Sequence, residues 1–452
     1  MQIIIIGCGK VGRYLVHELA EENHDVTIVD INDETVRNTA AQYDIMGVVG
    51  NGTSYTTLEE AGIQDADIVI AVTESDEVNL LCCFMARKAN CKTIARVRNP
   101  IYSAESEKFR QELGISMIIN PEKAGAAEML RLLQFPSAVD ISSFAKGGID
   151  MITFRVKKTS SIVGRQLKNI TEFQKYQILI CIAERDGEVT IPNGDFIINE
   201  GDVLSVIALP GQAANIFKEV GIYSDTVKNA MIIGIGQTGY YLADMLLKAG
   251  IQVKIVERNR KRCEEVAMLL PKADVIYGDG CDEQLLLEEH IQDMDACVAS
   301  TDIDEENIIL SLYAREKVHK KVVTKMSHLE FNNVIQSLNL DSVVNPKETT
   351  AETILMYVRA MSNSSGSSNV QTLYKLKDDR VEALEFIVHS ESKLIGIEFR
   401  AMKLKKNVLI AGIMRKGKLI IPGGADSFMS EDSVFIARTN KGFLKLEDIV
   451  ER

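Results

Sequence analysis

The chain has 452 residues, of which 46% are hydrophobic and 25% charged, proportions that are typical of soluble globular proteins. Its 64 acidic residues exceed its 51 basic ones, and the resulting net charge of −13 argues against nucleic acid or anionic lipid as a direct partner. No stretch approaches the roughly 18 uncharged apolar residues of a membrane span, and the apolar start MQIIIIG has no basic flank. It therefore predicts a buried strand rather than a signal peptide, and a protein of the cytoplasm.

The first 135 residues alternate two kinds of pattern. Short apolar runs predict buried strands, at 2–6, 26–30, 45–49, 67–72, 93–97 and 115–119. Helical spacing predicts the helices between and after them, at 11–22, 33–42, 76–89 and 121–133. Strands that are apolar along their whole length favour a parallel sheet covered on both faces. This segment therefore predicts a Rossmann-like, doubly wound α/β lobe.

The next stretch has a different character. Short apolar or alternating runs occur at 151–156, 178–184, 187–191 and 203–208. Glycine and proline separate them, most clearly in the Pro192-Asn193-Gly194 turn. The pattern predicts a small β-rich lobe.

The second half of the chain repeats the first. IIIIGCGKVG at 3–12 matches AMIIGIGQTG at 230–239, and SSIVGRQL at 160–167 matches SKLIGIEF at 392–399. The predicted fold is therefore two Rossmann-like lobes, each followed by a small β-rich α+β lobe. The predicted bounds are 1–135, 140–223, 228–361 and 370–452. The serine-rich stretch 362–368 predicts a flexible linker before the last lobe.

A glycine-rich turn follows the first predicted strand and opens a helix. Gly7 allows the tight turn, Gly9 lets the backbone approach a pyrophosphate, and Gly12 lets helix and strand pack. The helix N-terminus then offers unpaired N–H groups to phosphate, beside the positive charge of Lys10. Asp30 ends the second strand, where a carboxylate accepts ribose hydroxyls and repels a 2′-phosphate. NAD-like or adenosine ligands are favoured over NADP.

The same pattern recurs in the second half with Gly234, Gly236, Gly239 and Glu257. Arg258 follows Glu257 directly and is able to meet a phosphate on the ribose, so the ligand of this half stays open. The alternative for both halves is a Rossmann fold that has lost its ligand.

Other polar residues follow predicted strands, at the sheet edge where such folds bind ligands. In the first half these are Asn51, Thr73, Glu74 and Arg98, and in the second half Asp279, Thr301 and Asp302. Met326 aligns with Arg98, which predicts that the two sites differ. The alternative is turn chemistry at these loops, with Asp76 as a helix cap.

Neither a catalytic nor a metal site emerges from the sequence. The six histidines are scattered and the cysteines lie mostly in apolar stretches, which disfavours zinc. Tyr240 and Tyr241 are assigned to packing or surface on a helix. A dehydrogenase needs a substrate domain with an acid or base near the nicotinamide, and here only a small β lobe follows. Binding is favoured over catalysis, with an NAD-dependent oxidoreductase as the alternative.

The ordered pattern GCGKVG, Asp30, GNGT, DADIVIAVTESDEVN, IARVRNP and a β lobe with IPNGD, present twice, resembles the TrkA family of Trk potassium-uptake systems. The resemblance implies RCK N-lobes and C-lobes that assemble into a homo-oligomeric ring. It also implies a multi-span potassium-transport partner, which would hold the chain at the cytoplasmic face of the inner membrane. An RCK regulator of another cation transporter is the alternative.

The resemblance further implies that NAD/NADH, or ATP/ADP, binds each N-lobe. By position, the first site would comprise Gly7, Cys8, Gly9, Lys10, Val11, Asp30, Thr73, Glu74 and Arg98, and the second Gly234, Ile235, Gly236, Gln237, Thr238, Glu257, Thr301 and Asp302. The glycine pattern and the loops described above add Gly12 and Asn51 to the first site, and Gly239 and Asp279 to the second. Lys10 departs from the polar Gln that is usual at its place.

Overall fold

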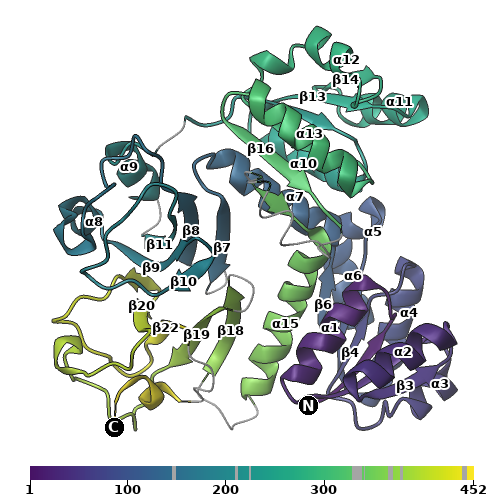
Figure 1. The fold of residues 1–452 in the computed structure, drawn as a ribbon. Helices are drawn as coiled ribbons and strands as arrows, with labels where there is room; N and C mark the ends of the chain where they lie inside the picture. Colours follow the sequence, from purple (N-terminus) through teal and green to yellow (C-terminus); the bar gives the residue numbers. More distant parts are fainter. Residues whose placement is uncertain are drawn as a thin grey trace. The chain divides into compact units, whose positions relative to one another are not determined.

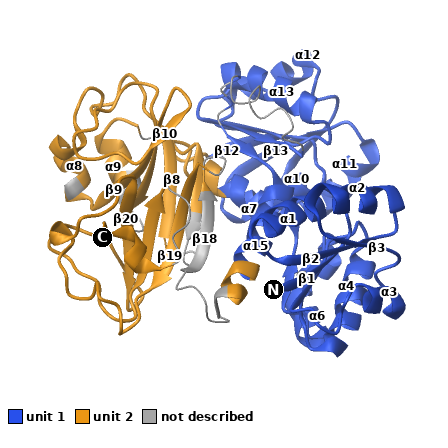
Figure 2. Ribbon diagram, turned by 60° about the horizontal axis from the view of Figure 1, so that its bottom comes forward, with its two compact units in different colours: residues 1–130, 228–357 blue, residues 131–227, 358–452 orange. Residues whose placement is uncertain are grey.

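The computed structural model describes residues 1–144, 149–208, 212–222, 225–327, 338, 340, 342–364, 370–376, 380–439 and 445–451. The chain divides into two compact units, shown in Figure 2. One unit combines residues 1–130 with 228–357, and the other combines residues 131–227 with 358–452. Each unit is thus built from both halves of the chain.

The first sheet of the first unit is six-stranded, in the order β3-β2-β1-β4-β5-β6, and all its pairings are parallel. Its strands are β1 Gln2–Ile6, β2 Asp25–Asp30, β3 Met46–Val49, β4 Ile68–Ala71, β5 Lys92–Arg96 and β6 Met117–Ile119. The helices of this lobe are α1 Lys10–Glu21, α2 Asp33–Tyr43, α3 Tyr55–Glu60, α4 Asp76–Ala86, α5 Pro100–Ala104, α6 Ser106–Leu113 and α7 Pro121–Gln134.

The second sheet of this unit repeats the first in the order β14-β13-β12-β15-β16-β17. Its strands are β12 Asn229–Ile233, β13 Gln252–Glu257, β14 Asp274–Tyr277, β15 Ala296–Ala299, β16 Lys321–Lys325 and β17 Val343–Val344. The helices are α10 Gln237–Lys248, α11 Arg260–Leu269, α12 Glu283–Glu288, α13 Asp304–Lys317 and α15 Pro346–Ser364. Figure 1 traces the first lobe in purple and blue and the second in green.

The apolar strands explain the parallel sheets. Ile3 to Ile6 of β1 are all buried, as are Ile68 to Ala71 of β4, because helices cover both faces. The strand order reverses between β1 and β4, and again between β12 and β15. In open α/β sheets this switch point, outside the carboxyl ends of the strands, is where ligands bind.

The second unit holds two antiparallel sheets. The first has the order β10-β9-β11-β8-β7, and the second, written in the corresponding direction, has the order β21-β20-β22-β19-β18. The first contains β7 Asp140–Phe144, β8 Ile149–Arg155, β9 Ile178–Arg185, β10 Glu188–Thr190 and β11 Val203–Ala208, with helices α8 Thr171–Lys175 and α9 Gln212–Glu219. The second contains β18 Val370–Leu376, β19 Val381–Ile387, β20 Val408–Arg415, β21 Lys418–Ile420 and β22 Ser433–Arg438.

One ion pair with a buried carboxylate recurs in both β-rich lobes. Arg185 donates two hydrogen bonds of 2.7 and 2.8 Å to Asp202, and Arg415 donates two of 2.8 and 2.7 Å to Asp432.

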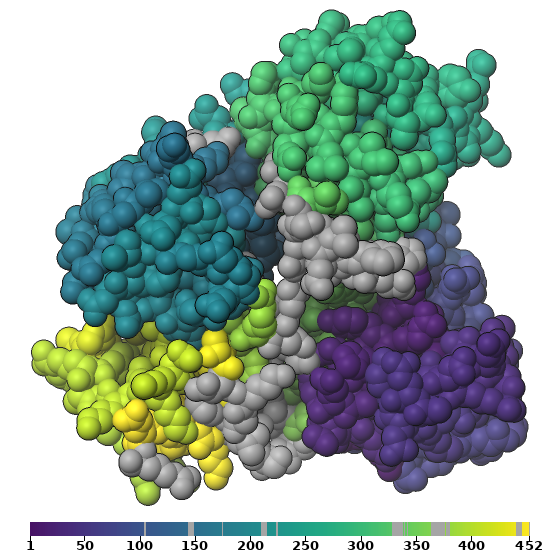
Figure 3. Space-filling model, viewed as in Figure 1, coloured from purple at the N-terminus to yellow at the C-terminus, as the bar shows by residue number. Residues whose placement is uncertain are grey.

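Side chains from both sheets, including Ile182 and Phe435, share one apolar core. In the space-filling view of Figure 3, the first β-rich lobe is drawn in blue to teal and the second in lime to yellow.

The linker prediction is wrong in part. Residues 362–364 belong to the last turn of α15, which ends at Ser364. Residues 365–368 lie outside the described residues.

Among the helices that the structure describes, none is long and apolar enough to cross a membrane.

Candidate nucleotide-binding sites

The three glycines of the first turn have three different surroundings. Gly7 has a φ of +105°, and a Cβ there would lie 2.8 Å from the backbone nitrogen of Thr73. A Cβ on Gly12 would lie 1.9 Å from the Gly7 carbonyl oxygen, whereas one on Gly9 would meet no atom of the described residues within 4 Å. Gly7 and Gly12 are therefore required by the fold, and the open space at Gly9 lets another molecule approach the backbone.

The first helix begins directly at this open space. α1 starts at Lys10, and Gly9 at its N-cap position supplies no side-chain cap. The N–H groups of the first turn and their partial positive charge therefore face outward, beside the exposed Lys10 side chain. Such an end is suited to a phosphate group.

Asp30 is bonded to the turn itself. Its Oδ2 accepts a hydrogen bond of 2.6 Å from the Cys8 backbone N–H, and its Oδ1 accepts one of 2.9 Å from Asn32. An ionised carboxylate has about four acceptor positions, so two remain for ribose hydroxyls. Asp30 thus holds the turn in place while it keeps capacity for a ligand.

The side chains of Cys8 and Val11 are buried inside the lobe. The Cys8 Sγ lies 3.2 Å from the Thr39 hydroxyl inside the lobe, and burial raises the pKa of this thiol. Val11 is 5% exposed and packs in the core. Neither side chain faces the open space at Gly9.

The loops at the carboxyl ends of the strands show turn chemistry. Thr73 donates from its backbone N–H to the Asn79 side chain at 2.8 Å, and the Asn51 side chain accepts a bond of 3.0 Å from the Thr53 backbone. The contact between Gly7 and Thr73 brings the Thr73 loop to the turn, with Glu74 exposed next to it. The Asn51 side chain therefore stabilises its own turn, which is the alternative that the sequence left open for this residue.

Arg98 lies in the loop after β5, and its side chain is paired. Its Nε donates to Glu122 at 2.7 Å, and the side chain is 37% exposed. Its backbone N–H donates to both Asp76 oxygens, at 3.0 and 2.9 Å. Asp76 as a helix cap is therefore wrong, because Ser75 caps α4 and Asp76 reaches across to the Arg98 loop.

Sequence reasoning missed two cations near this edge. Arg96 is 8% exposed, donates from Nη1 to the Thr73 carbonyl at 3.1 Å, and has a buried Nε without a partner in the described part of the chain. Burial lowers the pKa of Lys347 at the start of α15, and the nearby Lys10 and Arg96 lower it further. An arginine at the end of an apolar strand was a signal available in the sequence.

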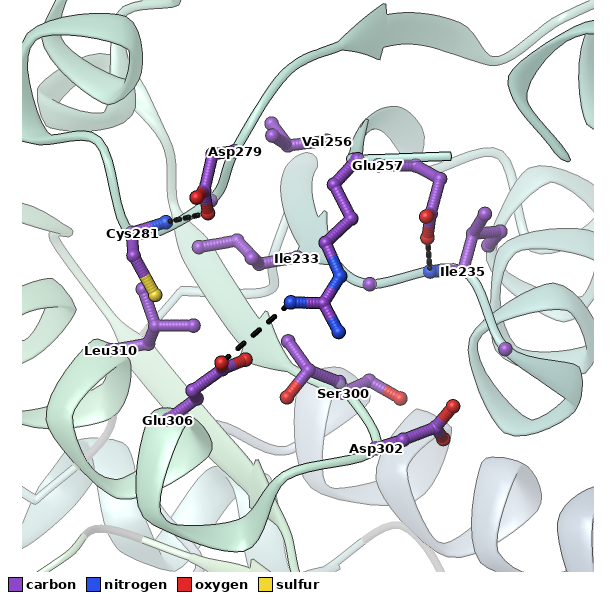
Figure 4. A pocket seen from close by; sticks show the side chains of 15 residues that line it. Ile233, Ile235, Val256, Glu257, Asp279, Cys281, Ser300, Asp302, Glu306 and Leu310 are labelled. Atoms are coloured by element: carbon purple, nitrogen blue, oxygen red, sulfur yellow. Dashed lines mark hydrogen bonds and ion pairs between the residues drawn. The ribbon is translucent and has the colours of Figure 1, made fainter. Parts of the chain in front are cut away.

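The second site contains a pocket, seen closely in Figure 4. It is lined by Ile233, Gly234, Ile235, Gly236, Val256, Glu257, Arg258, Asp279, Gly280, Cys281, Ser300, Thr301, Asp302, Glu306 and Leu310. Glu257 repeats the part of Asp30, because its Oε2 accepts 2.9 Å from the Ile235 N–H and its Oε1 accepts 2.8 Å from Asn259. Gln237, Thr238 and Gly239 begin α10 and lie outside this lining.

The second pocket differs from the first site in its polar groups. Arg258 forms an ion pair of 3.8 Å with Glu306, and Lys325 forms one of 3.4 Å with Asp302. Ser300 is 1% exposed and its hydroxyl has no partner in the described residues, at the place that Val72 fills in the first half. Within the described residues, no group of three His, Cys, Asp or Glu side chains is able to hold a metal ion.

The alignment of Met326 with Arg98 is wrong. The Ser327 backbone N–H donates to both oxygens of Asp304, as Arg98 does to Asp76. Met326 instead matches Val97, because both are buried and donate to the last strand of their sheet. The residue of the second half that corresponds to Arg98 is therefore Ser327.

Comparisons with known proteins agree with this duplicated architecture. The TrkA-N domain matches residues 3–121 and 230–346, and the TrkA-C domain matches residues 151–221 and 383–450. The Trk system potassium uptake protein TrkA homolog 1 of Methanosarcina mazei is 32% identical over 433 residues, which cover 94% of each chain. The Trk system potassium uptake protein TrkA of Haemophilus influenzae is 30% identical over 429 residues, 93% of this chain and 92% of that one.

Solved structures share the fold. The GsuK channel bound to NAD has a TM-score of 0.63 at 18% identity and covers 97% of this chain and 76% of that chain. The crystal structure of the GsuK RCK domain has a TM-score of 0.62 at 18% identity, with coverages of 97% and 92%. With two TrkA-N and two TrkA-C domains in tandem, the chain belongs to the TrkA family.

Proposed function

We propose that this chain is the nucleotide-sensing regulatory subunit of a membrane potassium-uptake system. One observation carries the proposal. The turn, the open second glycine and the carboxylate that accepts from the turn N–H occur twice, at Asp30 and at Glu257. The chain keeps this geometry in both halves and belongs to a family whose members are named for potassium uptake. We therefore assign it two nucleotide sites that regulate one transport activity.

The ligand that fits both turns is NAD/NADH or an adenine nucleotide. The helix N-termini suit a pyrophosphate, and the free acceptor positions of Asp30 and Glu257 suit two ribose hydroxyls. GsuK, which has the same fold, is known in a form bound to NAD. We assign the phosphate to the backbone of Gly7–Gly12 and of Gly234–Gly239, with Thr73, Glu74, Thr301 and Asp302 at the edges.

We infer that the ligand is bound and not transformed. In the described residues of the second pocket, Arg258 is paired with Glu306 and Asp302 with Lys325, while Glu257 accepts from two backbone N–H groups. Glu257 is held in place by the turn, whereas the Asp302 and Arg258 side chains are 90% and 62% exposed. None of the three is buried in the way that tunes a side chain for proton transfer. The alternative of an oxidoreductase predicts consumption of NADH with a small substrate.

The regulatory action follows from differential affinity. A ligand shifts a two-state assembly only by the ratio of its affinities for the two states, and about 3 kcal/mol of difference gives a bias of roughly a hundredfold. We propose that these chains form a ring whose geometry depends on the bound nucleotide. The ring would act on a multi-span partner from the cytoplasmic side, through lobes bounded near 1–135, 140–223, 228–361 and 370–452.

The test is a flux measurement with the membrane partner in lipid vesicles. Rubidium uptake is measured with and without this chain, and in the presence of NADH, NAD⁺, ATP or ADP. The proposal predicts that the chain changes the flux and that at least one nucleotide alters this change. A flux that depends on the chain but is identical with every nucleotide would contradict nucleotide sensing, and loss of NADH absorbance would favour the oxidoreductase.

A further inference from the structure

A tyrosine of the second Rossmann lobe is bonded to the first. Tyr241 lies on α10 and is 7% exposed. Its hydroxyl lies 3.3 Å from the Arg98 carbonyl oxygen, to which it donates. The Asn120 Nδ2 donates to the same hydroxyl at 3.1 Å and to the same carbonyl at 3.2 Å. These groups, together with the Ser103 side chain that also bonds to Tyr241, form one hydrogen-bonded cluster from two lobes.

The cluster holds a loop at the edge of the first nucleotide site. The Arg98 backbone N–H is fixed by Asp76 from one side, and its carbonyl is fixed by Tyr241 and Asn120 from the other. These bonds fix the backbone of Arg98 and therefore the position of its Cα, from which the side chain extends. Burial raises the pKa of Tyr241, so the hydroxyl stays protonated and keeps its donor at neutral pH.

The same helix reaches the second nucleotide site. α10 begins at Gln237, directly after the turn of Gly234 and Gly236, and Tyr241 comes four residues later. Four residues of α-helix rise about 6 Å, which is close to one turn. If phosphate binding moves the N-terminus of α10, a rigid helix carries that movement to the Tyr241 hydroxyl.

We propose that Tyr241 is a positioning residue that sets the Arg98 loop of the first nucleotide site and so couples the occupancy of the two sites within one chain. The proposal rests on the proposed function, since it needs nucleotide at both turns. The coupling is reciprocal, because each ligand must change the affinity for the other by the same factor.

The pseudo-equivalent tyrosine supplies a matched control. Tyr14 occupies the same place on α1 and also bonds to the other lobe, with its hydroxyl donating to Glu352 on α15 at 3.0 Å. Glu352 lies within a helix and not in a strand-end loop. Tyr14→Phe thus removes an interlobe tyrosine hydrogen bond, here to a carboxylate rather than to a backbone carbonyl, without touching the Arg98 loop.

The experiment measures nucleotide affinity at the first site in two backgrounds, the unsubstituted chain and Gly236→Ala, in which the second site is disabled. In each background, calorimetric titrations with NADH, NAD⁺, ATP and ADP are made without a further change, with Tyr241→Phe and with Tyr14→Phe. The signal of the second site alone is taken from Gly9→Ala. Thermal unfolding of every variant records its stability.

The proposal predicts that Tyr241→Phe weakens first-site binding by up to about fivefold, the limit reached when the full free energy of one ordinary hydrogen bond differs between the free and the bound form. It also predicts that the difference between the intact and the Gly236→Ala forms disappears in Tyr241→Phe and persists in Tyr14→Phe. If Tyr241→Phe lowers the unfolding temperature as Tyr14→Phe does but leaves first-site affinity unchanged, the role of Tyr241 is structural and the inference fails. Absence of any nucleotide binding to the unsubstituted chain overturns the proposed function as well.

Discussion

At the scale of single residues, the two carboxylates at the strand ends serve the fold and the ligand together. Asp30 accepts from the Cys8 and Asn32 N–H groups, and Glu257 accepts from Ile235 and Asn259. Because the turn depends on these bonds, an alanine at either position would disturb the turn and the ligand contact at once. An amide is the sharper replacement, since it keeps one oxygen acceptor.

Asp30→Asn should lower both stability and affinity. One backbone N–H loses its charged acceptor, which costs about 1–3 kcal/mol of unfolding free energy. A weakened ribose contact should reduce nucleotide affinity at the first site by about 10- to 100-fold. Urea unfolding and calorimetric titration measure the two effects. Asp33→Asn is the control, because Asp33 is exposed and forms an ion pair with Arg37 on the helix surface, and an equal loss of affinity there would contradict the assignment.

Lys347 should show the opposite behaviour, since its charge is unfavourable without a ligand. Burial, Lys10 and Arg96 lower its pKa, so the unfolded chain holds this proton more firmly than the folded chain. Lys347 therefore costs stability at neutral pH, and the cost fades as pH rises towards the ordinary lysine pKa. Lys347→Met should raise the unfolding temperature of the ligand-free chain, most at neutral pH and least at alkaline pH. It should also reduce the stabilisation that ATP gives, and a variant of lower stability at pH 7 would contradict the account.

At the scale of elements, the turn that joins β1 to α1 separates a fold requirement from a ligand requirement. Gly12→Ala would place a Cβ 1.9 Å from the Gly7 oxygen and should cost about 3 kcal/mol or more. Gly9→Ala meets no atom within 4 Å and sits in extended backbone with a φ of −72°, so it should change stability by less than about 1 kcal/mol. Thermal unfolding of the two variants checks this, and equal losses would mean that the turn is placed wrongly.

The sequence predicted the strands better than the short helices. β4 and all but the first residue of β1 are apolar, and β2 has a buried β-branched centre between two aspartates, so these strands were plain in the sequence. α3, α5 and α6 were missed, because they are short and α6 has no buried face to produce a helical pattern. The register of the second half was misjudged near Met326, where only the bonds from Ser327 to Asp304 reveal the correct match.

At the scale of the whole molecule, the pairing of the two halves was beyond sequence reasoning. Tyr241 was assigned to packing or surface, yet it bonds to Asn120, which lies 121 residues earlier in the chain. A pattern along one helix shows that a side chain is buried, but it does not name the surface that buries it. The glycines and carboxylates were predictable because each turn forms within one lobe.

The central claim is that this chain has two nucleotide sites, and calorimetric titration of the folded chain tests it most directly. The titration is made with NADH, NAD⁺, ATP and ADP on the unsubstituted chain, on Gly9→Ala, on Gly236→Ala and on the double variant. A Cβ on Gly236 meets only Asp302 Oδ1 at 3.7 Å, so this change is also expected to spare the fold. The account predicts two bound nucleotides per chain, one in each single variant and none in the double variant, at nearly constant unfolding temperature. Binding that survives in the double variant, or no binding to the unsubstituted chain, would contradict it.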